Sequence, residues 1–176
     1  MRYKSLTRVL ALDLHPRRFG YVVLERPDRL LNWGVCSYRG KGKPNAVLIQ
    51  RRLRPLLEMW NPTLLVTHTA PQLPPRQKLL RERLIKGVVA EAKSKRARVR
   101  ILKSTRGWTK NLTKYERARE VAELFPVLIG RQPQKRKPWE SEHYSMSVFT
   151  AAALAMAPGT NEESEADEAA LTGRGQ

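Results

Sequence analysis

The chain has 176 residues, enough for one domain with a hydrophobic core and too few for two ordinary domains. Its 34 lysines and arginines outnumber 16 aspartates and glutamates, and the net charge of +18 favours a polyanionic partner, above all nucleic acid. No apolar stretch approaches the roughly 20 residues of a membrane span, and the N-terminus lacks the apolar region of a signal peptide. We therefore expect a cytoplasmic protein with no membrane partner.

The hydrophobic patterns of a folded domain extend over residues 1–157. The remaining segment, 158–176, is acidic and poor in apolar residues. Such a composition cannot bury enough apolar surface to offset the entropy of ordering. The sequence predicts a single domain over 1–157 and an acidic disordered tail over 158–176.

Three short apolar or β-branched runs open the chain, separated by the turn-rich segments HPRR and RPDR. This pattern is typical of consecutive antiparallel strands. The predicted strands are Arg8–Asp13, Phe19–Glu25 and Leu31–Tyr38. Apolar residues at helical spacing then predict a helix over Ala46–Trp60, with Pro55 inside it. The continuous apolar run Thr63–Thr67 predicts a buried strand.

A long amphipathic helix is predicted over Arg76–Lys93. Its apolar stripe includes Leu80 and Leu84, and the helical pattern places the basic residues of the segment, Arg81 among them, off that stripe. A short strand is predicted over Val99–Leu102.

The last third of the domain is predicted to be helical. Thr113, with Glu116 three residues later, has the form of a capping box that begins a helix. That helix is expected to run to Phe125 and to stop at Pro126. After a basic loop, a run of small residues predicts a final helix ending near Ala157.

The predicted order is three strands, a helix, a strand, a helix, a strand and two helices. Hairpins join antiparallel neighbours, and helical crossovers join parallel ones. The order predicts an α/β fold with a five-stranded mixed sheet, three antiparallel strands followed by two parallel ones, flanked by helices. A Rossmann sheet is disfavoured, because neither Gly-x-Gly-x-x-Gly nor a phosphate-loop lysine motif is present.

Asp13 closes the first apolar run and precedes a basic turn. A carboxylate after Leu12 would carry a desolvation penalty unless a partner satisfied it. A divalent metal ion is one such partner. Arg17 or Arg18 is the alternative. His15 lies in the same turn, where it is expected to face solvent or a phosphate.

Four segments resemble the RuvC family of Holliday junction resolvases within the RNase H-like superfamily. They are LALDLHPRRFGYVVLE, WNPTLLVTHTA, RERLIKGVVAEAKSKRARVRILKS, and TKYERAREVAELF followed by FTAAALAMA. The resemblance implies an RNase H-like fold, divalent-metal-dependent cleavage of branched DNA and a homodimer. RuvC-like nucleases hold two metal ions with an Asp ending the first strand, a Glu ending the fourth and two acids at the start of the final helix.

Only the first of these acids is plainly retained, as Asp13. The fourth strand offers His68, and the two helix acids fall at Ser147 and Thr150. Two-metal hydrolysis needs bridging and flanking carboxylates, so a single one is not enough.

Three residues before the final helix could rebuild the site. The candidate metal ligands are Asp13, Glu140, Glu142 and His143, and the candidate catalytic residues are Asp13, His68 and Glu142. The ion would be Mg²⁺ or Mn²⁺. Alternatively, Ser141 caps the final helix, and Glu140, Glu142 and His143 lie in its first turn. In that case His68 is a structural hydrogen-bonding residue.

Two basic segments each contain a tryptophan. Nine basic residues and no acid lie between Lys93 and Lys114, and a second cluster surrounds Trp139. Such segments are suited to tracking phosphates and stacking on bases. The candidate nucleic-acid-binding residues are Arg17, Arg18, Lys103, Arg106, Trp108, Lys110, Lys114, Lys135, Arg136, Lys137 and Trp139. The alternative is a solvated charge run whose tryptophans anchor the loops to the core.

Two kinds of function therefore stand. One is a divergent metal-dependent endonuclease or Holliday junction resolvase that acts on branched or structured nucleic acid. The other is a catalytically inactive RNase H-like protein that binds DNA or RNA, or a basic subunit of a nucleoprotein complex. Carboxylates within bridging distance of Asp13 would favour the enzyme, and Ser147 and Thr150 facing it would favour the binding protein.

Overall fold

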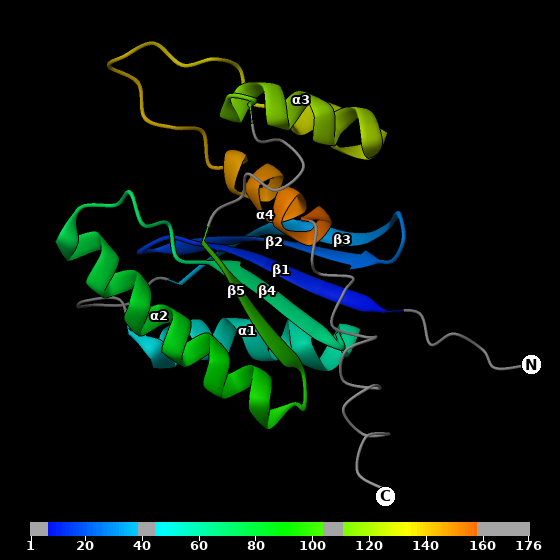
Figure 1. The fold of residues 1–176 in the computed structure, drawn as a ribbon, viewed down its shortest axis with the longest axis vertical. Coiled ribbons are helices and arrows are strands. Elements are labelled where there is room, and N and C mark those ends of the chain that lie inside the picture. Colours follow the sequence, from blue (N-terminus) through cyan, green and yellow to red (C-terminus); the bar gives the residue numbers. More distant parts are fainter. Residues whose placement is uncertain (1–6, 39–44, 104–110, 158–176) are drawn as a thin grey trace, which may run out of the picture.

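A computed structural model describes residues 7–38, 45–103 and 111–157. A five-stranded sheet lies between two layers of helices (Figure 1). The strands are β1 (Arg8–Leu14), β2 (Arg18–Glu25), β3 (Arg29–Ser37), β4 (Leu64–His68) and β5 (Arg98–Leu102). The helices are α1 (Ala46–Trp60), α2 (Pro75–Ser94), α3 (Lys114–Leu124), the 3₁₀ helix η1 (Pro126–Arg131) and α4 (Met146–Met156).

The sheet has the order β3-β2-β1-β4-β5. β1 pairs antiparallel with β2, and β2 antiparallel with β3. β4 is parallel to both β1 and β5. The predicted mixed sheet is thereby confirmed, and β1 is its central strand.

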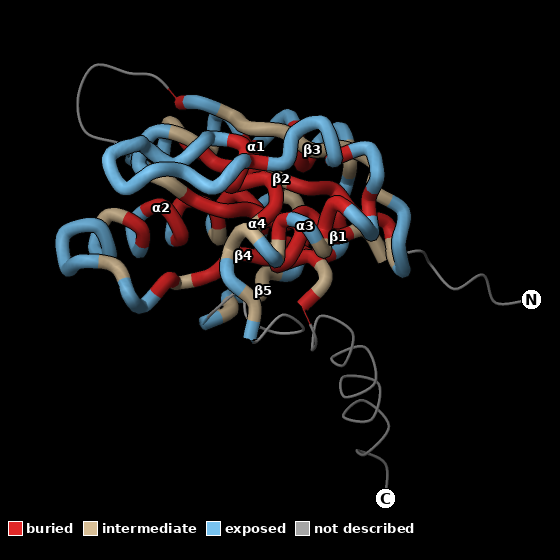
Figure 2. The backbone as a smooth tube through the Cα atoms, turned by 90° about the horizontal axis from the view of Figure 1, so that it is seen from above, coloured by how far each residue is buried: buried red, intermediate tan, exposed pale blue. Residues whose placement is uncertain are grey.

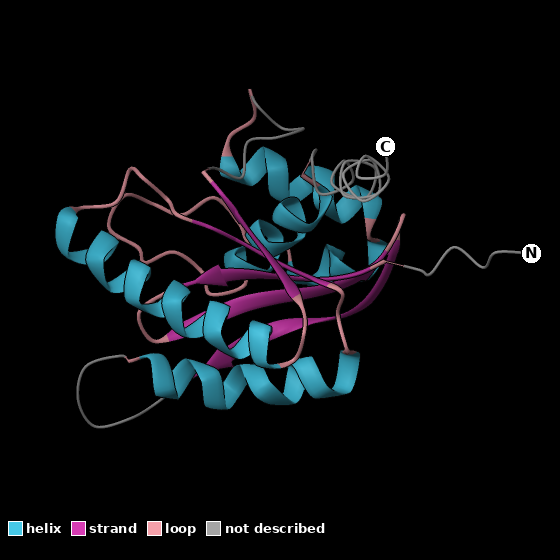
Figure 3. Cartoon of the chain, turned by 60° about the horizontal axis from the view of Figure 1, so that its bottom comes forward, coloured by secondary structure: helices cyan, strands magenta, loops and turns pink. Residues whose placement is uncertain are grey.

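Alternation of side chains along β1 divides the core into two parts. Val9 and Ala11 belong to the cluster that includes residues of α3 and α4. Leu10, Leu12 and Leu14 belong to the cluster on the other face, with residues of α1 and α2. Figure 3 shows these helix pairs on opposite faces of the sheet, and Figure 2 shows β1, β2 and β4 as largely buried. Burial on both faces fixes the direction of every β1 side chain, including that of Asp13.

Local capping explains where two of the helices begin. The Asn45 side chain accepts a hydrogen bond from the Leu48 backbone N–H at the start of α1. The predicted capping box is present before α3: Thr113 Oγ1 accepts from the Glu116 N–H, and the Glu116 carboxylate accepts from the Thr113 N–H. Each cap satisfies backbone donors that the first helical turn leaves free.

The fold adds one element and corrects one sequence prediction. Pro126–Arg131, most of which the sequence left unassigned, forms η1 and buries Leu128 in the core. Arg81 is not on the polar face of α2, because it is only 7% exposed.

The predicted tail, 158–176, lies outside the described residues. Among the residues that are described, no helix is long and apolar enough to cross a membrane.

Candidate functional site

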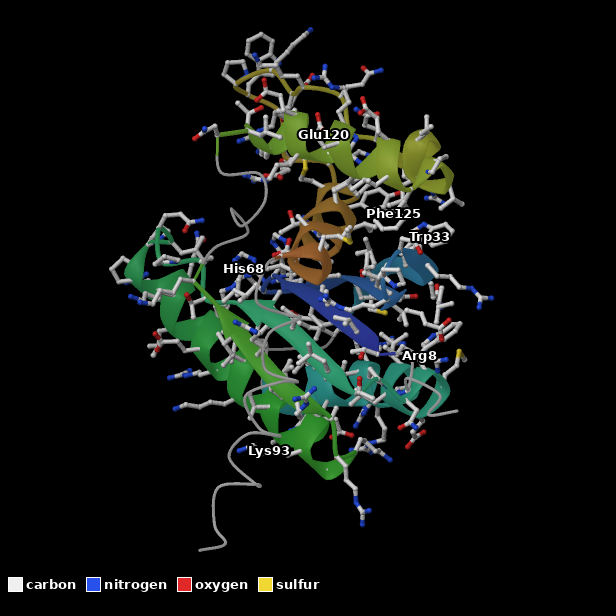
Figure 4. The ribbon with its side chains drawn as sticks, turned by 45° about the vertical axis from the view of Figure 1, so that its right-hand side comes forward. Arg8, Trp33, His68, Lys93, Glu120 and Phe125 are labelled. Atoms are coloured by element: carbon white, nitrogen blue, oxygen red, sulfur yellow. The ribbon has the colours of Figure 1, made fainter. Side chains whose placement is uncertain are left out.

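Asp13 and His68 lie side by side at the edge of the sheet where two parallel strands end. Ala11 of β1 is in register with Val66 of β4, and extending that register by two residues pairs Asp13 with His68. Both side chains are buried, with residue exposures of 5% and 7%. Figure 4 labels His68 at this end of the sheet.

The Asp13 carboxylate is hydrogen-bonded through both oxygens. Its Oδ1 lies 2.9 Å from His68 Nε2 and 3.2 Å from Arg81 Nη2, and its Oδ2 lies 2.8 Å from His15 Nε2. The alternative to a metal partner, pairing of Asp13 with Arg17 or Arg18, is wrong: the carboxylate is bonded to two imidazoles and to the guanidinium of Arg81.

Arg81 reaches this site from the buried face of α2. Its Nε donates to the His68 carbonyl at 3.0 Å, and its Nη1 donates to the Leu14 carbonyl at 2.7 Å. Since Leu14 and His68 are the last residues of β1 and β4, the guanidinium joins two strand ends and the carboxylate between them. These are charge-assisted hydrogen bonds in a buried place, the kind that contributes most.

One ring nitrogen of His68 is in contact with two groups. His68 Nε2 lies 2.9 Å from Asp13 Oδ1 and 2.7 Å from Arg81 Nη2. A single imidazole nitrogen either donates or accepts, so it cannot make both hydrogen bonds at once. Donation to the negative carboxylate is the stronger arrangement, and it leaves Nε2 without a lone pair for any other ligand.

His15 is held in the turn after β1. Its backbone carbonyl accepts a hydrogen bond from the buried Tyr38 hydroxyl, and its N–H donates to the Arg18 carbonyl at 2.9 Å. Burial raises the pKa of Tyr38, against the opposing effect of Arg81 and Arg18, so the hydroxyl stays a donor. The expectation that His15 faces solvent is only partly met, because its side chain is 35% exposed and bonded to Asp13.

The electrostatics of Asp13 follow from these contacts. Burial raises the pKa of the carboxyl, but hydrogen bonds and charge interactions with His15 and His68 outweigh it. The pKa of Asp13 is consequently well below its usual range. Asp13 is an anion at neutral pH, and its charge is met by protein groups.

Solved structures of Holliday junction resolvases have a similar architecture. RuvC from Thermus thermophilus in complex with a Holliday junction substrate matches with a TM-score of 0.61 and 18% identity, covering 85% of this chain and 90% of that chain. A second Thermus thermophilus RuvC structure matches with a TM-score of 0.60 and 16% identity, over 85% of this chain and 91% of that one. The chain has a RuvC-like RNase H fold.

The yeast mitochondrial Holliday junction resolvase matches with a TM-score of 0.51 and 16% identity, over 86% of this chain and 79% of that chain. At such identities the likeness establishes the fold, and the role of each residue must come from the site itself. No protein-family model matches the sequence, and no curated protein does.

The start of α4 lies against the same part of the RuvC-like sheet. Gly20 is the register partner of Asp13 in β2, and a Cβ added there would lie 2.4 Å from the Ser147 carbonyl carbon. Gly20 therefore lets α4 approach β2 closely. Ser147 Oγ donates to the Tyr144 carbonyl, and Thr150 Oγ1 donates to the Met146 carbonyl. Both hydroxyls thus bond the backbone of their own segment.

The three residues expected to rebuild a metal site lie in the loop before α4. The Glu140 carboxylate accepts from the Lys137 N–H, Glu142 pairs with Lys114 at 2.9 Å, and His143 Nδ1 lies 2.6 Å from Ser145 Oγ. The alternative helix cap at Ser141 is also wrong, because α4 begins only at Met146 and has no side-chain cap.

The donor set does not fit the two-metal site of a RuvC-like nuclease. Mg²⁺ requires hard oxygen ligands in octahedral array, whereas Asp13 is surrounded by imidazole and guanidinium nitrogens. Within residues 7–38, 45–103 and 111–157, no three His, Cys, Asp or Glu side chains are grouped to hold a metal ion. The predicted ligand set of Asp13, Glu140, Glu142 and His143 gains no support from this geometry.

Basic side chains gather at the same end of the RuvC-like sheet. Lys103 follows Leu102, the register partner of His68. The Lys114–Glu142 ion pair joins the start of α3 to the loop before α4, and α4 begins over Gly20. The exposed members of the predicted set are Arg17, Lys103, Lys135, Arg136, Lys137 and Trp139, with Arg18 and Lys114 half-buried. Arg106, Trp108 and Lys110 lie outside the described residues.

Trp139 is the most exposed of the described large apolar side chains, at 78%, and Lys137 Nζ lies 5.6 Å from its ring centre. The alternative role of Trp139 as an anchor to the core is therefore wrong. An exposed ring with a cation over it can stack on a base.

Proposed function

We propose that this protein binds branched DNA, a four-way junction in particular, and does not cleave it by two-metal hydrolysis. One observation carries the proposal: Arg17, Arg18 and Lys103 follow or open strands at the end of the sheet where Asp13 is bonded to Arg81, His15 and His68. The RuvC-like fold supports the choice of substrate, since a RuvC of this fold has been solved with a Holliday junction.

Recognition would depend on phosphate geometry rather than base sequence. Exposed Lys135, Arg136 and Lys137 would contact phosphates, and Trp139 would stack on a base left unpaired at the branch point. Contacts of this kind position a protein on a branched backbone without reading base edges.

The binding test compares a labelled four-way junction with a duplex of equal length, by fluorescence anisotropy in EDTA. We expect tighter binding to the junction. Replacing Lys135, Arg136 and Lys137 with alanine should lower the magnitude of the salt slope by about 2–3, because each lost phosphate contact removes about 0.9. The matched control replaces the exposed Arg29, Arg51 and Arg52, which belong to β3 and α1. Equal loss in both triple variants would reject the basic loop as the binding surface.

The cleavage test decides between this proposal and the predicted endonuclease. Junction incubated with protein and Mg²⁺ or Mn²⁺ should remain intact while it stays bound. Metal-dependent cleavage that disappears in Asp13→Asn, with binding retained, would overturn the proposal in favour of a resolvase. The predicted homodimer is tested in the same preparation by light scattering, with and without junction.

A further inference from the structure

We propose that Arg81 is the built-in cation of this site, and that its guanidinium keeps a divalent metal ion away from Asp13. This inference rests on the proposed function for its biological meaning, because it explains binding without a metal. Its test uses no DNA, so either proposal can fail without the other.

The position of the guanidinium carries the inference. A metal ion ligated by Asp13 and by the residue at position 68 would have to contact both side chains at once. Arg81 Nη2 already does so, 3.2 Å from Asp13 Oδ1 and 2.7 Å from His68 Nε2, two atoms that are themselves 2.9 Å apart. The same group is fixed by its bonds to the Leu14 and His68 carbonyls, so it cannot swing aside without leaving two buried acceptors unpaired.

The ligands themselves are occupied as well. Both oxygens of Asp13 accept hydrogen bonds, and His68 Nε2 is already in contact with two partners. A divalent ion would have to displace these bonds and then remain beside a positive guanidinium that is itself only 7% exposed. Repulsion between two cations is strong where water does not screen it.

An arginine that only neutralised a buried acid would need a single contact with it. Arg81 instead donates to three acceptors, one on each strand end and one on the acid between them. A guanidinium that excludes a metal ion differs measurably from one that only neutralises Asp13. If Arg81 excludes the ion, replacing Arg81 and supplying a second carboxylate should allow a metal ion to bind.

The experiment measures Mn²⁺ binding by electron paramagnetic resonance and by the Mn²⁺-induced change in Tm. The test variant carries Arg81→Met and His68→Glu. The matched control carries Arg83→Met and His68→Glu, since Arg83 is exposed on the same helix and the change in charge is equal. We expect the test variant to bind Mn²⁺ at least ten-fold more tightly than the control, with a rise in Tm that the control lacks. Equal affinities in the two variants, or no Mn²⁺ binding by the folded test variant, would overturn the proposal.

A second comparison decides the matter if the test variant does not fold. Wild type and Asp13→Asn are titrated with Mn²⁺ in the same way. Equally weak binding by both supports the proposal, because Asp13 then contributes no ligand. A stoichiometric Mn²⁺ site in the wild type that is lost in Asp13→Asn contradicts it.

Discussion

The substitution Arg81→Met tests how much the guanidinium contributes to the folded state. Methionine keeps an unbranched stem but removes the donors to Asp13, Leu14 and His68. Breaking a buried ion pair by removing one partner costs about 3–5 kcal/mol. His15 and His68 still contact Asp13 after the change, so we expect the lower end, about 3 kcal/mol. For a chain of this size that is a fall in Tm of about 6–12 °C.

The assay is urea denaturation followed by circular dichroism, for wild type, Arg81→Met, Asp13→Asn and the double variant. The cycle should give a coupling free energy of about 1–3 kcal/mol, because the two side chains are in contact and almost fully buried. Arg83→Met on the exposed face of α2 should change stability by less than about 0.5 kcal/mol. A cost below about 1 kcal/mol for Arg81→Met, or additivity of the two changes, would refute the reasoning.

Three further predictions concern stability. Folding lowers the pKa of Asp13, so the ionised carboxylate contributes its full stabilisation above the ordinary carboxyl pKa of 3.8 and loses it as the pH falls towards the lower folded value. The free energy of unfolding should therefore fall between about pH 4 and pH 2 more steeply in wild type than in Asp13→Asn. Equal slopes in the two proteins would contradict a lowered pKa for Asp13. Gly20→Ala places a Cβ about 2.5 Å from Ser147 atoms and should cost about 1–3 kcal/mol in urea denaturation, whereas Gly130→Ala, with nothing within 4 Å, should be nearly neutral. Thr113→Ala removes the cap of α3 and should cost about 1 kcal/mol, with an unchanged Tm counting against the capping box.

The sheet could be predicted because its signals are local. Alternating and continuous apolar runs fixed each strand to within a few residues, and the HPRR and RPDR turns separated the hairpins. One boundary that differs lies at a hairpin turn: β3 begins at Arg29 rather than Leu31, because pairing with Glu25 extends it. Cross-strand partners of this kind are not visible in one strand's own sequence.

The candidate site was less accessible to prediction. Asp13 and His68 could be placed together because parallel strands end at one edge of a sheet. Arg81 was placed on the polar face of α2, since helical patterns count arginine as polar although its stem can be buried. One signal was present: Arg81 lies three and seven residues before Leu84 and Val88, so it shares their buried face.

The residues before α4 were placed in the wrong environment for a different reason. From the sequence alone, the carboxylates of Glu140 and Glu142 are interpreted as available metal ligands. In the structure Glu142 pairs with Lys114, a residue 28 positions away, and no pattern within the segment PWESEHY indicates that partner.

The bonds of Arg81 to Leu14 and His68 also join α2 rigidly to the end of the sheet. The exposed cations of that helix are therefore held at a fixed position relative to the sheet edge that carries Asp13; they are Arg76, Lys78, Arg83 and Lys86. A preorganised charge array loses little conformational freedom when a partner arrives. The same arginine that is proposed to exclude a metal ion would in this way reduce the conformational entropy that the protein loses when it associates with a rigid, branched polyanion.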